Sequence, residues 1–148
     1  MDSLELDAIL RRNPVTRNVY CGVHPADKIP VIRHFPCAMI VNLDKASEPG
    51  THWVAMYAPN QCTLRYFDSF GGTCDGPIKE YINKNFLFVR RQTCQIQSPA
   101  SDACGYYALM FLYLSAAKEK YEDVFRTIAR QPNPDAFVKR YVLQNVIV

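Results

Sequence analysis

Cys104 stands where a polar loop turns into an apolar helix, a position that makes a thiol reactive. The proline-containing stretch 97–103 leads into Cys104-Gly105, and the apolar run 108–114 follows. Unpaired backbone N–H groups and the helix dipole in a first helical turn stabilise an anion, which favours the thiolate. Because the thiolate is the nucleophilic form, the pattern predicts a nucleophile at Cys104. The alternative is a structural cysteine, since unpaired cysteines are often buried.

A histidine and an aspartate upstream are predicted to lie side by side. One predicted strand begins at His52, a second ends at Asp68, and Asn60-Gln61 lies in the middle of their connection. In an antiparallel hairpin the start of the first strand lies beside the end of the second. A carboxylate stabilises a protonated imidazole, and an imidazolium lowers the pKa of a neighbouring thiol. Cys104, His52 and Asp68 are therefore a candidate nucleophile, base and orienting acid.

The order of these residues resembles the adenovirus-type cysteine proteases, the adenain family. The resemblance is carried by four short runs: His52-Trp53, Phe-Asp-Ser-Phe-Gly at 67–71, Gln97-Ser98-Pro99 with its glutamine seven residues before the cysteine, and Ala-Cys-Gly at 103–105. Enzymes of this type are encoded by viruses, virophages and transposons of the Maverick/Polinton type, and the family is related to the SUMO-protease group. The orienting acid is Glu in the adenovirus enzymes, whereas Asp, as here, occurs in the SUMO-protease group.

The resemblance implies four roles: Cys104 as nucleophile, His52 as its base, Asp68 as orienting acid, and Gln97 as an oxyanion-hole donor. Acyl transfer builds negative charge on the carbonyl oxygen, and removing one fixed donor typically costs about 100- to 1000-fold in rate. The alternative for Gln97 is an exposed loop residue, which most glutamines are.

The function implied by the resemblance is a cysteine endopeptidase that cleaves viral capsid or core precursors at Gly-Gly-type sites during virion maturation. It would act in the virion and in the host nucleus or cytoplasm. Two alternatives remain open: a ubiquitin-like-protein isopeptidase, and a catalytically dead binding module on the same fold. The sequence requires no cofactor, but the family implies activation by a peptide, through a disulfide, and by DNA. Cys94 is a poor match for the cysteine that would pair with such a peptide.

Composition is that of one globular domain over residues 1–148, with 49% hydrophobic and 21% charged residues. The formal net charge is +3, and basic pairs occur at Arg11-Arg12, Arg90-Arg91 and Lys139-Arg140. These pairs could form a DNA-binding patch or be ordinary solvated surface charge. We expect a monomer with no membrane segment, no secretory signal and no metal site, and with reduced thiols.

The expected fold class is α+β, with a papain-like cysteine protease core in which a mainly antiparallel sheet packs on a central helix carrying the nucleophile. Residues 13–36 are expected to be an irregular stretch that could wall a cleft. The predicted strands are 37–43, 52–58, 62–68, 86–90 and 93–97. The predicted helices are 3–12, 78–83, 103–118, 121–130 and 134–143.

Overall fold

A computed structural model describes residues 1–44, 52–72 and 74–147 of the chain. The described helices are α1 (Ser3–Arg12), α2 (Gly76–Asn85), α3 (Cys104–Ala116), α4 (Tyr121–Ala129) and α5 (Pro134–Asn145). The described strands are β1 (Tyr20–Pro25), β2 (Cys37–Asn42), β3 (Trp53–Asn60), β4 (Thr63–Phe67) and β5 (Phe88–Arg91).

The described strands form one sheet in the order β1-β2-β3-β4-β5. The inner pairings, β2 with β3 and β3 with β4, are antiparallel. The outer strands β1 and β5 each pair in parallel with their neighbour. The predicted α+β class is confirmed, with an antiparallel centre to the sheet and parallel pairing at its two edges.

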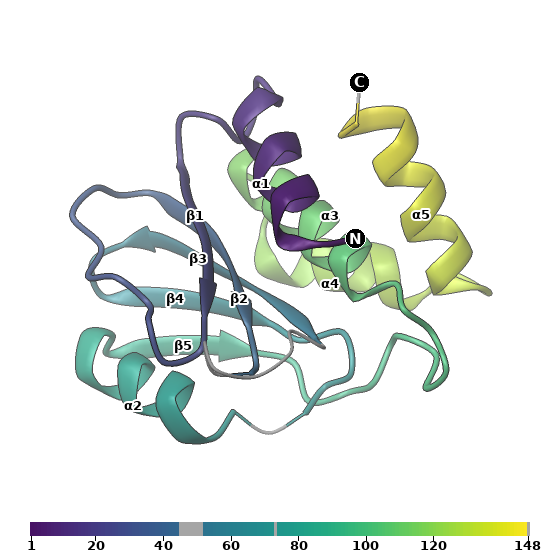
Figure 1. Ribbon diagram of the computed structural model, residues 1–148. Helices are drawn as coiled ribbons and strands as arrows, with labels where there is room; N and C mark the ends of the chain where they lie inside the picture. The colour runs from purple at the N-terminus through teal and green to yellow at the C-terminus, as the bar shows by residue number, and fades with distance from the viewer. Residues whose placement is uncertain (45–51, 73, 148) are drawn as a thin grey trace.

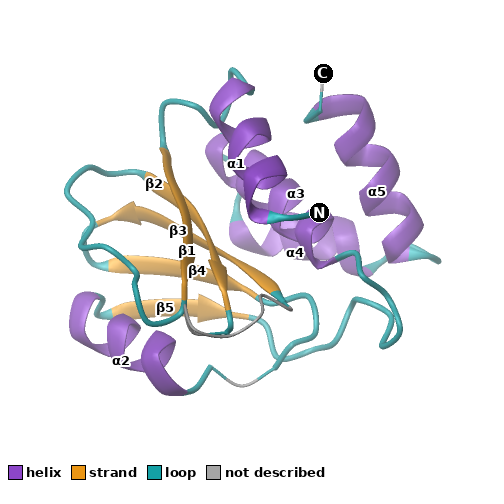
Figure 2. Ribbon diagram, in the orientation of Figure 1, coloured by secondary structure: helices purple, strands orange, loops and turns teal. Residues whose placement is uncertain are grey.

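Helices cover both faces of this sheet (Figures 1 and 2). α1, α3, α4 and α5 gather on one face, and α2 lies on the other. β2 is buried along its whole length, as expected for an apolar strand that is covered on both faces. α3 packs against β2 and β3, and the run 107–112 within it is buried. A helix that is apolar on all sides belongs in the interior, so the sequence itself directs α3 to the centre.

The hairpin of β3 and β4 is closed by Asn60. Its side-chain oxygen accepts the backbone N–H groups of Cys62 and Thr63 at 2.9 and 3.1 Å. An asparagine side chain that bonds the backbone two residues on mimics a turn, which explains why the chain reverses here. The hairpin predicted from the sequence is therefore confirmed.

Two segment predictions are wrong. Residues 20–25, expected within an irregular stretch, form β1, which has no alternating apolar pattern and depends on pairing with β2. Residues 93–97, expected to be a strand, lie outside β5. The backbone N–H groups of Ile96 and Gln97 both bond the carbonyl of Ser69, each at 2.9 Å, which a strand ladder does not allow.

The expectation of reduced thiols is wrong for one pair of cysteines. A disulfide joins Cys21 in β1 to Cys37 in β2, with the Cα atoms 6.1 Å apart. Because β1 was not predicted, nothing in the sequence pattern indicated that these two residues would meet. The free cysteines among the described residues are Cys62, Cys74, Cys94 and Cys104.

Candidate active site

His52 and Asp68 form a buried pair at one end of the sheet. The Nε2 atom of His52 lies 2.7 Å from a carboxylate oxygen of Asp68. The hairpin register explains the adjacency: Ala55 of β3 pairs with Phe67 of β4, so the residues just before β3 and just after β4 meet at the same sheet end. The predicted proximity of the two side chains is present in the structure.

The carboxylate of Asp68 is held in its charged form. Burial by itself would raise its pKa, but the hydrogen bond with His52 and backbone N–H groups of Phe70 and Gly72 lower it below the usual range. The Phe70 N–H lies 2.9 Å from the carboxylate oxygen that also faces His52. The side chain of Gln92 donates to the Asp68 backbone carbonyl and so fixes the main chain at this point.

Cys104 is the first residue of α3, within the first helical turn where the sequence predicts it, and it is only 8% exposed. Burial would raise the pKa of its thiol. The His52 side chain outweighs burial, with help from the backbone N–H groups of Trp53 and Gly105, and the pKa of the thiol is lowered. The thiolate is therefore favoured by the imidazolium and by N–H groups around the start of α3.

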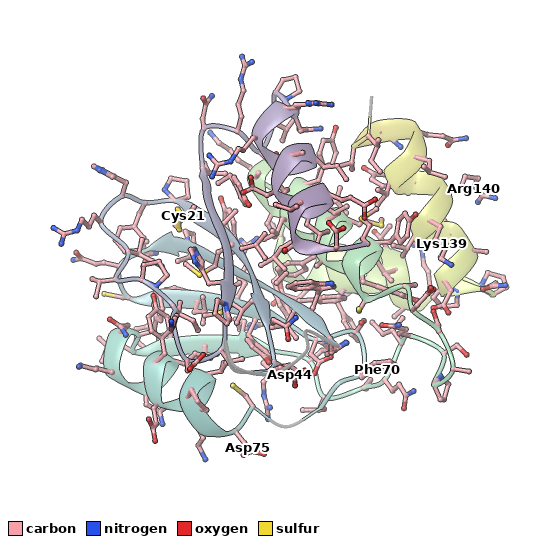
Figure 3. The ribbon with its side chains drawn as sticks, viewed as in Figure 1. Cys21, Asp44, Phe70, Asp75, Lys139 and Arg140 are labelled. Carbon is pink, nitrogen blue, oxygen red and sulfur yellow. A yellow bond between two sulfur atoms is a disulfide. The ribbon has the colours of Figure 1, made fainter. Side chains whose placement is uncertain are left out.

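The pKa of His52 moves in the opposite direction. Burial would lower it, but the hydrogen bond to Asp68 and the influence of the Cys104 thiol raise it to about 9. Because Nε2 faces Asp68, the buried Nδ1 atom is the ring nitrogen left for the thiol, and no hydrogen bond to another group of the described residues occupies it. The ring of Phe70 packs against the imidazole, with ring centroids 4.6 Å apart. Figure 3 shows Phe70 at the end of the sheet, near the loop that leads to α3.

These opposite shifts favour a thiolate–imidazolium pair over the neutral thiol and imidazole. In this state Cys104 is already nucleophilic, and the protonated His52 can give its proton to a leaving group. Asp68 holds the ring through Nε2 and stabilises its positive charge. The arrangement is suited to nucleophilic attack followed by proton transfer, as in acyl transfer.

Gln97 is not an exposed loop residue, because it is 1% exposed. Its amide oxygen accepts a hydrogen bond from the Ser69 hydroxyl at 2.6 Å, and its amide nitrogen donates to the Ser101 carbonyl at 2.8 Å. The Ser101 hydroxyl in turn accepts the N–H of Ala103, the residue before Cys104. A short chain of hydrogen bonds thus ties the amide of Gln97 to the start of α3.

The sequence did not identify several residues that support this site. Ser69 and Gln92 are both buried and bond to Gln97 and Asp68, respectively. Tyr107 donates its hydroxyl to Asp135 at the start of α5 at 2.5 Å, which fixes α3 to that helix. Only Ser69 carried a signal in the sequence, its position directly after Asp68.

Trp53, the residue after His52, contributes through its backbone and its side chain. Its backbone N–H faces the Cys104 thiol, and its indole N–H donates to the Met1 carbonyl at 3.2 Å. A Cβ atom built on Gly105 would lie 3.3 Å from the Cβ of Met1 and 3.7 Å from the Trp53 ring. The start of the chain therefore packs beside the nucleophile-bearing turn.

The three basic pairs lie on different elements: α1, β5 and α5 (Figure 3 labels Lys139 and Arg140 on α5). α1 packs on β1, at the sheet edge opposite β5, so the pairs on α1 and β5 are separated by the sheet. Arg11 and Lys139 also have acidic partners, Asp7 at 2.9 Å and Asp102 at 3.7 Å. The three pairs do not form one continuous patch.

The stretch 13–36, expected as a possible cleft wall, borders a hollow that is separate from the candidate active site. Part of the stretch 13–36, near Ala26 and Val31, lines a hollow of about 560 Å³ together with α2, and none of the four candidate residues lines it. Over residues 1–44, 52–72 and 74–147, no group of His, Cys, Asp or Glu side chains is arranged to hold a metal ion. Over the same residues, no helix has the length and apolar character that a membrane span requires.

Comparison with known proteins places this site on a known fold. The chain has the fold of a solved structure titled "Crystal Structure of ASFV pS273R protease", with a TM-score of 0.70 and 14% identity over 99% of this chain and 67% of the other. A second structure of that protease, with selenomethionine, matches with a TM-score of 0.55 and 19% identity over 76% of this chain and 45% of the other. At such identities the likeness shows the fold alone.

A relative detected by sequence is also named as a protease. The chain is 31% identical over 98 residues to a protein of Acanthamoeba polyphaga mimivirus named "Putative thiol protease R355", a match that covers 59% of this chain. The chain spans about a third of the length of this relative, with 32% of it covered. No family model matches the chain.

Proposed function

We propose that this protein is a cysteine endopeptidase in which Cys104, His52, Asp68 and Gln97 act together. The observation that carries the proposal is the buried His52–Asp68 pair, at 2.7 Å, beside a buried thiol at the start of α3. The lowered pKa of the thiol and the raised pKa of the imidazole agree with it. Further support comes from the fold shared with the ASFV pS273R protease and from the partial match to a protein named as a thiol protease.

The proposed reaction has two halves. The Cys104 thiolate attacks the peptide carbonyl carbon, a C–S bond forms, and the carbonyl electrons move to oxygen. That oxyanion would accept hydrogen bonds from the Gln97 amide and the backbone N–H of Cys104. As the tetrahedral intermediate collapses, the C–N bond breaks and His52 protonates the leaving amine. His52 then takes a proton from water, which attacks the thioester, and the C–S bond breaks to return the thiolate.

The substrate class follows from the adenain-like motifs rather than from the site geometry. We propose that the enzyme cleaves precursor proteins of a virus or virus-like element at Gly-Gly-type sites during particle maturation, within the particle and the host nucleus or cytoplasm. Activation by a peptide or by DNA belongs to the same proposal. Because the basic pairs on α1 and β5 are separated by the sheet, one DNA contact would not include both.

Covalent probes test the proposal directly. The purified protein is incubated with a Gly-Gly vinyl sulfone peptide and, in parallel, with a ubiquitin-like protein carrying the same warhead, and the adduct is mapped by mass spectrometry. We expect one adduct, on Cys104, from the short peptide. Cys104→Ala should not react, whereas Cys94→Ser, which removes an exposed free thiol, should react as the wild type does.

The outcomes separate the alternatives. Reaction with only the ubiquitin-like probe would favour the hypothesis of a ubiquitin-like-protein isopeptidase. Adduct formation that appears only when DNA or a candidate peptide is added would support activation. An unreactive Cys104 under all these conditions would overturn the proposal and favour a binding module on a protease fold.

A further inference from the structure

The amide of Gln97 is held at both of its polar atoms. Its oxygen accepts from the Ser69 hydroxyl at 2.6 Å, and its nitrogen donates to the Ser101 carbonyl at 2.8 Å. Gln97 and Ser69 are both 1% exposed, so water does not compete for these bonds. The side chain is therefore fixed in one orientation by two protein groups.

The chemistry of the partners determines which end of the amide faces which group. A carbonyl oxygen can only accept a hydrogen bond, so the group that faces the Ser101 carbonyl must be the NH₂. The amide oxygen must then face Ser69, and the hydroxyl of Ser69 must donate to it. This assignment follows from the donor and acceptor types of the groups.

The orientation matters because the amide nitrogen carries two N–H bonds. One N–H is used by Ser101, and the second is the donor that a substrate oxyanion could accept from. If the amide rotated by half a turn, its oxygen would face the Ser101 carbonyl, and the second N–H would no longer lie where it could donate to the oxyanion. The Ser101 carbonyl, which can only accept, disfavours this rotation. The Ser69 hydroxyl anchors the other end of the amide, and without it the amide oxygen would lose the hydrogen bond that restrains it.

The Ser69 backbone also holds Gln97, through a bond that does not depend on the hydroxyl. Its carbonyl accepts the N–H groups of Ile96 and Gln97, each at 2.9 Å. A change of the side chain alone should leave these bonds in place. Ser69 follows Asp68 directly, so adjacent residues hold the imidazole of His52 and the amide of Gln97.

We propose that Ser69 is a positioning residue, which orients the Gln97 amide toward the oxyanion of the acyl-transfer intermediate. The inference deepens the proposed function and rests on it. It predicts that the Ser69 hydroxyl acts only on steps that form an oxyanion, and only through Gln97.

Two reactions of the same thiol separate this role from a general structural one. Iodoacetamide alkylates Cys104 by displacement of iodide, forming a C–S bond without an oxyanion. Cleavage of a Gly-Gly peptide passes through an oxyanion. In Ser69→Ala we expect kcat to fall by about 10- to 100-fold, part of the loss for a missing donor. KM and the alkylation rate should stay within about twofold of wild type, because the hydroxyl bonds Gln97 and would act through it alone.

Matched variants sharpen the comparison. Ser101→Ala removes a hydroxyl from the same loop but keeps the carbonyl that bonds Gln97, so the ratio of cleavage to alkylation should not change. Ser69→Thr keeps a hydroxyl and should recover most of kcat if the added methyl group fits. In a Gln97→Ala background, Ser69→Ala should have no further effect, because its target is gone.

Three results would overturn the inference: an equal fall of alkylation and cleavage in Ser69→Ala, an unchanged kcat in that variant, or the same fall of kcat when Ser69→Ala is made in the Gln97→Ala background.

A further measurement does not need catalysis. In NMR spectra of the wild type, the side-chain N–H of Gln97 that bonds Ser101 should exchange slowly with solvent, and Ser69→Ala should speed this exchange at least tenfold. Unchanged exchange would also contradict the inference. If neither vinyl sulfone probe labels the wild type, the proposed function fails, while the exchange measurement still tests the orientation of Gln97.

Discussion

At the scale of single residues, the main feature is the buried group of Cys104, His52 and Asp68, whose charges favour transfer of the thiol proton to the imidazole. The pKa of the thiol is lowered and that of the imidazole is raised to about 9. Both side chains are buried, which by itself would favour the two neutral groups. Their mutual attraction, with Asp68 behind the ring, outweighs that cost.

Alkylation of Cys104 should therefore begin at a pH below the ordinary thiol value of about 8.5. In His52→Ala the lowering influence of the imidazolium is lost and burial remains, so the inflection should move to higher pH. The measurement is the rate of iodoacetamide modification of Cys104 against pH, followed by mass spectrometry in a Cys94→Ser background. A profile that does not change on His52→Ala would contradict the pairing.

Asp68→Asn tests the charge of the orienting group separately from its geometry. The Asn oxygen can still accept from the imidazole, but without a negative charge the pKa of His52 should fall below about 9. The high-pH limb of peptide cleavage, where His52 loses its proton, should therefore move to lower pH. The loss of kcat should be smaller than the ~100- to 10,000-fold that removal of a general acid–base group costs. An unmoved high-pH limb would show that Asp68 does not set this pKa.

At the scale of elements, the turn after β4 positions the acid. Gly71 has φ +64°, and its N–H bonds the Asp68 carbonyl at 2.8 Å. A Cβ atom at Gly71 would lie 2.6 Å from the backbone carbonyl of Cys94. Glycine is therefore favoured at position 71 for two reasons: its left-handed backbone conformation, and the close approach of the segment that leads to Gln97.

Gly76, the first residue of α2, separates these two requirements. It has nearly the same φ, +63°, but a Cβ there would meet no atom within 4 Å. Gly76→Ala should destabilise the protein by about 1 kcal/mol, the cost of the left-handed conformation. Gly71→Ala should cost more than about 2 kcal/mol, because the clash adds to it, and should also slow alkylation of Cys104. Urea unfolding measures both variants, and equal losses would show that the close approach to Cys94 is unimportant.

At the scale of the whole molecule, α3 joins the site to the main core. Phe111 of α3 stacks on Phe67 of β4 with ring centroids 4.7 Å apart, and both are buried. Phe67 directly precedes Asp68, so this contact also fixes the distance between the sheet and the nucleophile-bearing helix.

Phe111→Ala should lower the free energy of unfolding by about 3–5 kcal/mol, from lost burial and the cavity left behind. The matched control is Phe88→Ala on β5, where the side chain is 64% exposed and the change should stay within about 0.5 kcal/mol. Urea unfolding followed by circular dichroism measures both. Similar effects of the two substitutions would mean that the α3–sheet contact does not hold the fold together.

Much of this protein is determined by local sequence. The thiol at a helix start, the hairpin that brings His52 to Asp68, and the α+β class follow from turn residues, helix signals and apolar runs, which act over a few residues. The roles assigned to Cys104, His52, Asp68 and Gln97 depend on these features and on a motif resemblance, and they stay predictions until tested.

Only the tertiary structure decided the features that depend on residues far apart in the chain. β1 forms because β2 provides a parallel partner, and that pairing brings Cys21 to Cys37. Residues 93–97 leave the sheet because the turn at Ser69 captures their N–H groups. The burial of Gln97 and its bond to Ser69 arise in the same way. Hydrogen-bond partners 28 residues apart leave no periodic signal in the sequence, since their meeting depends on how the packed elements are arranged.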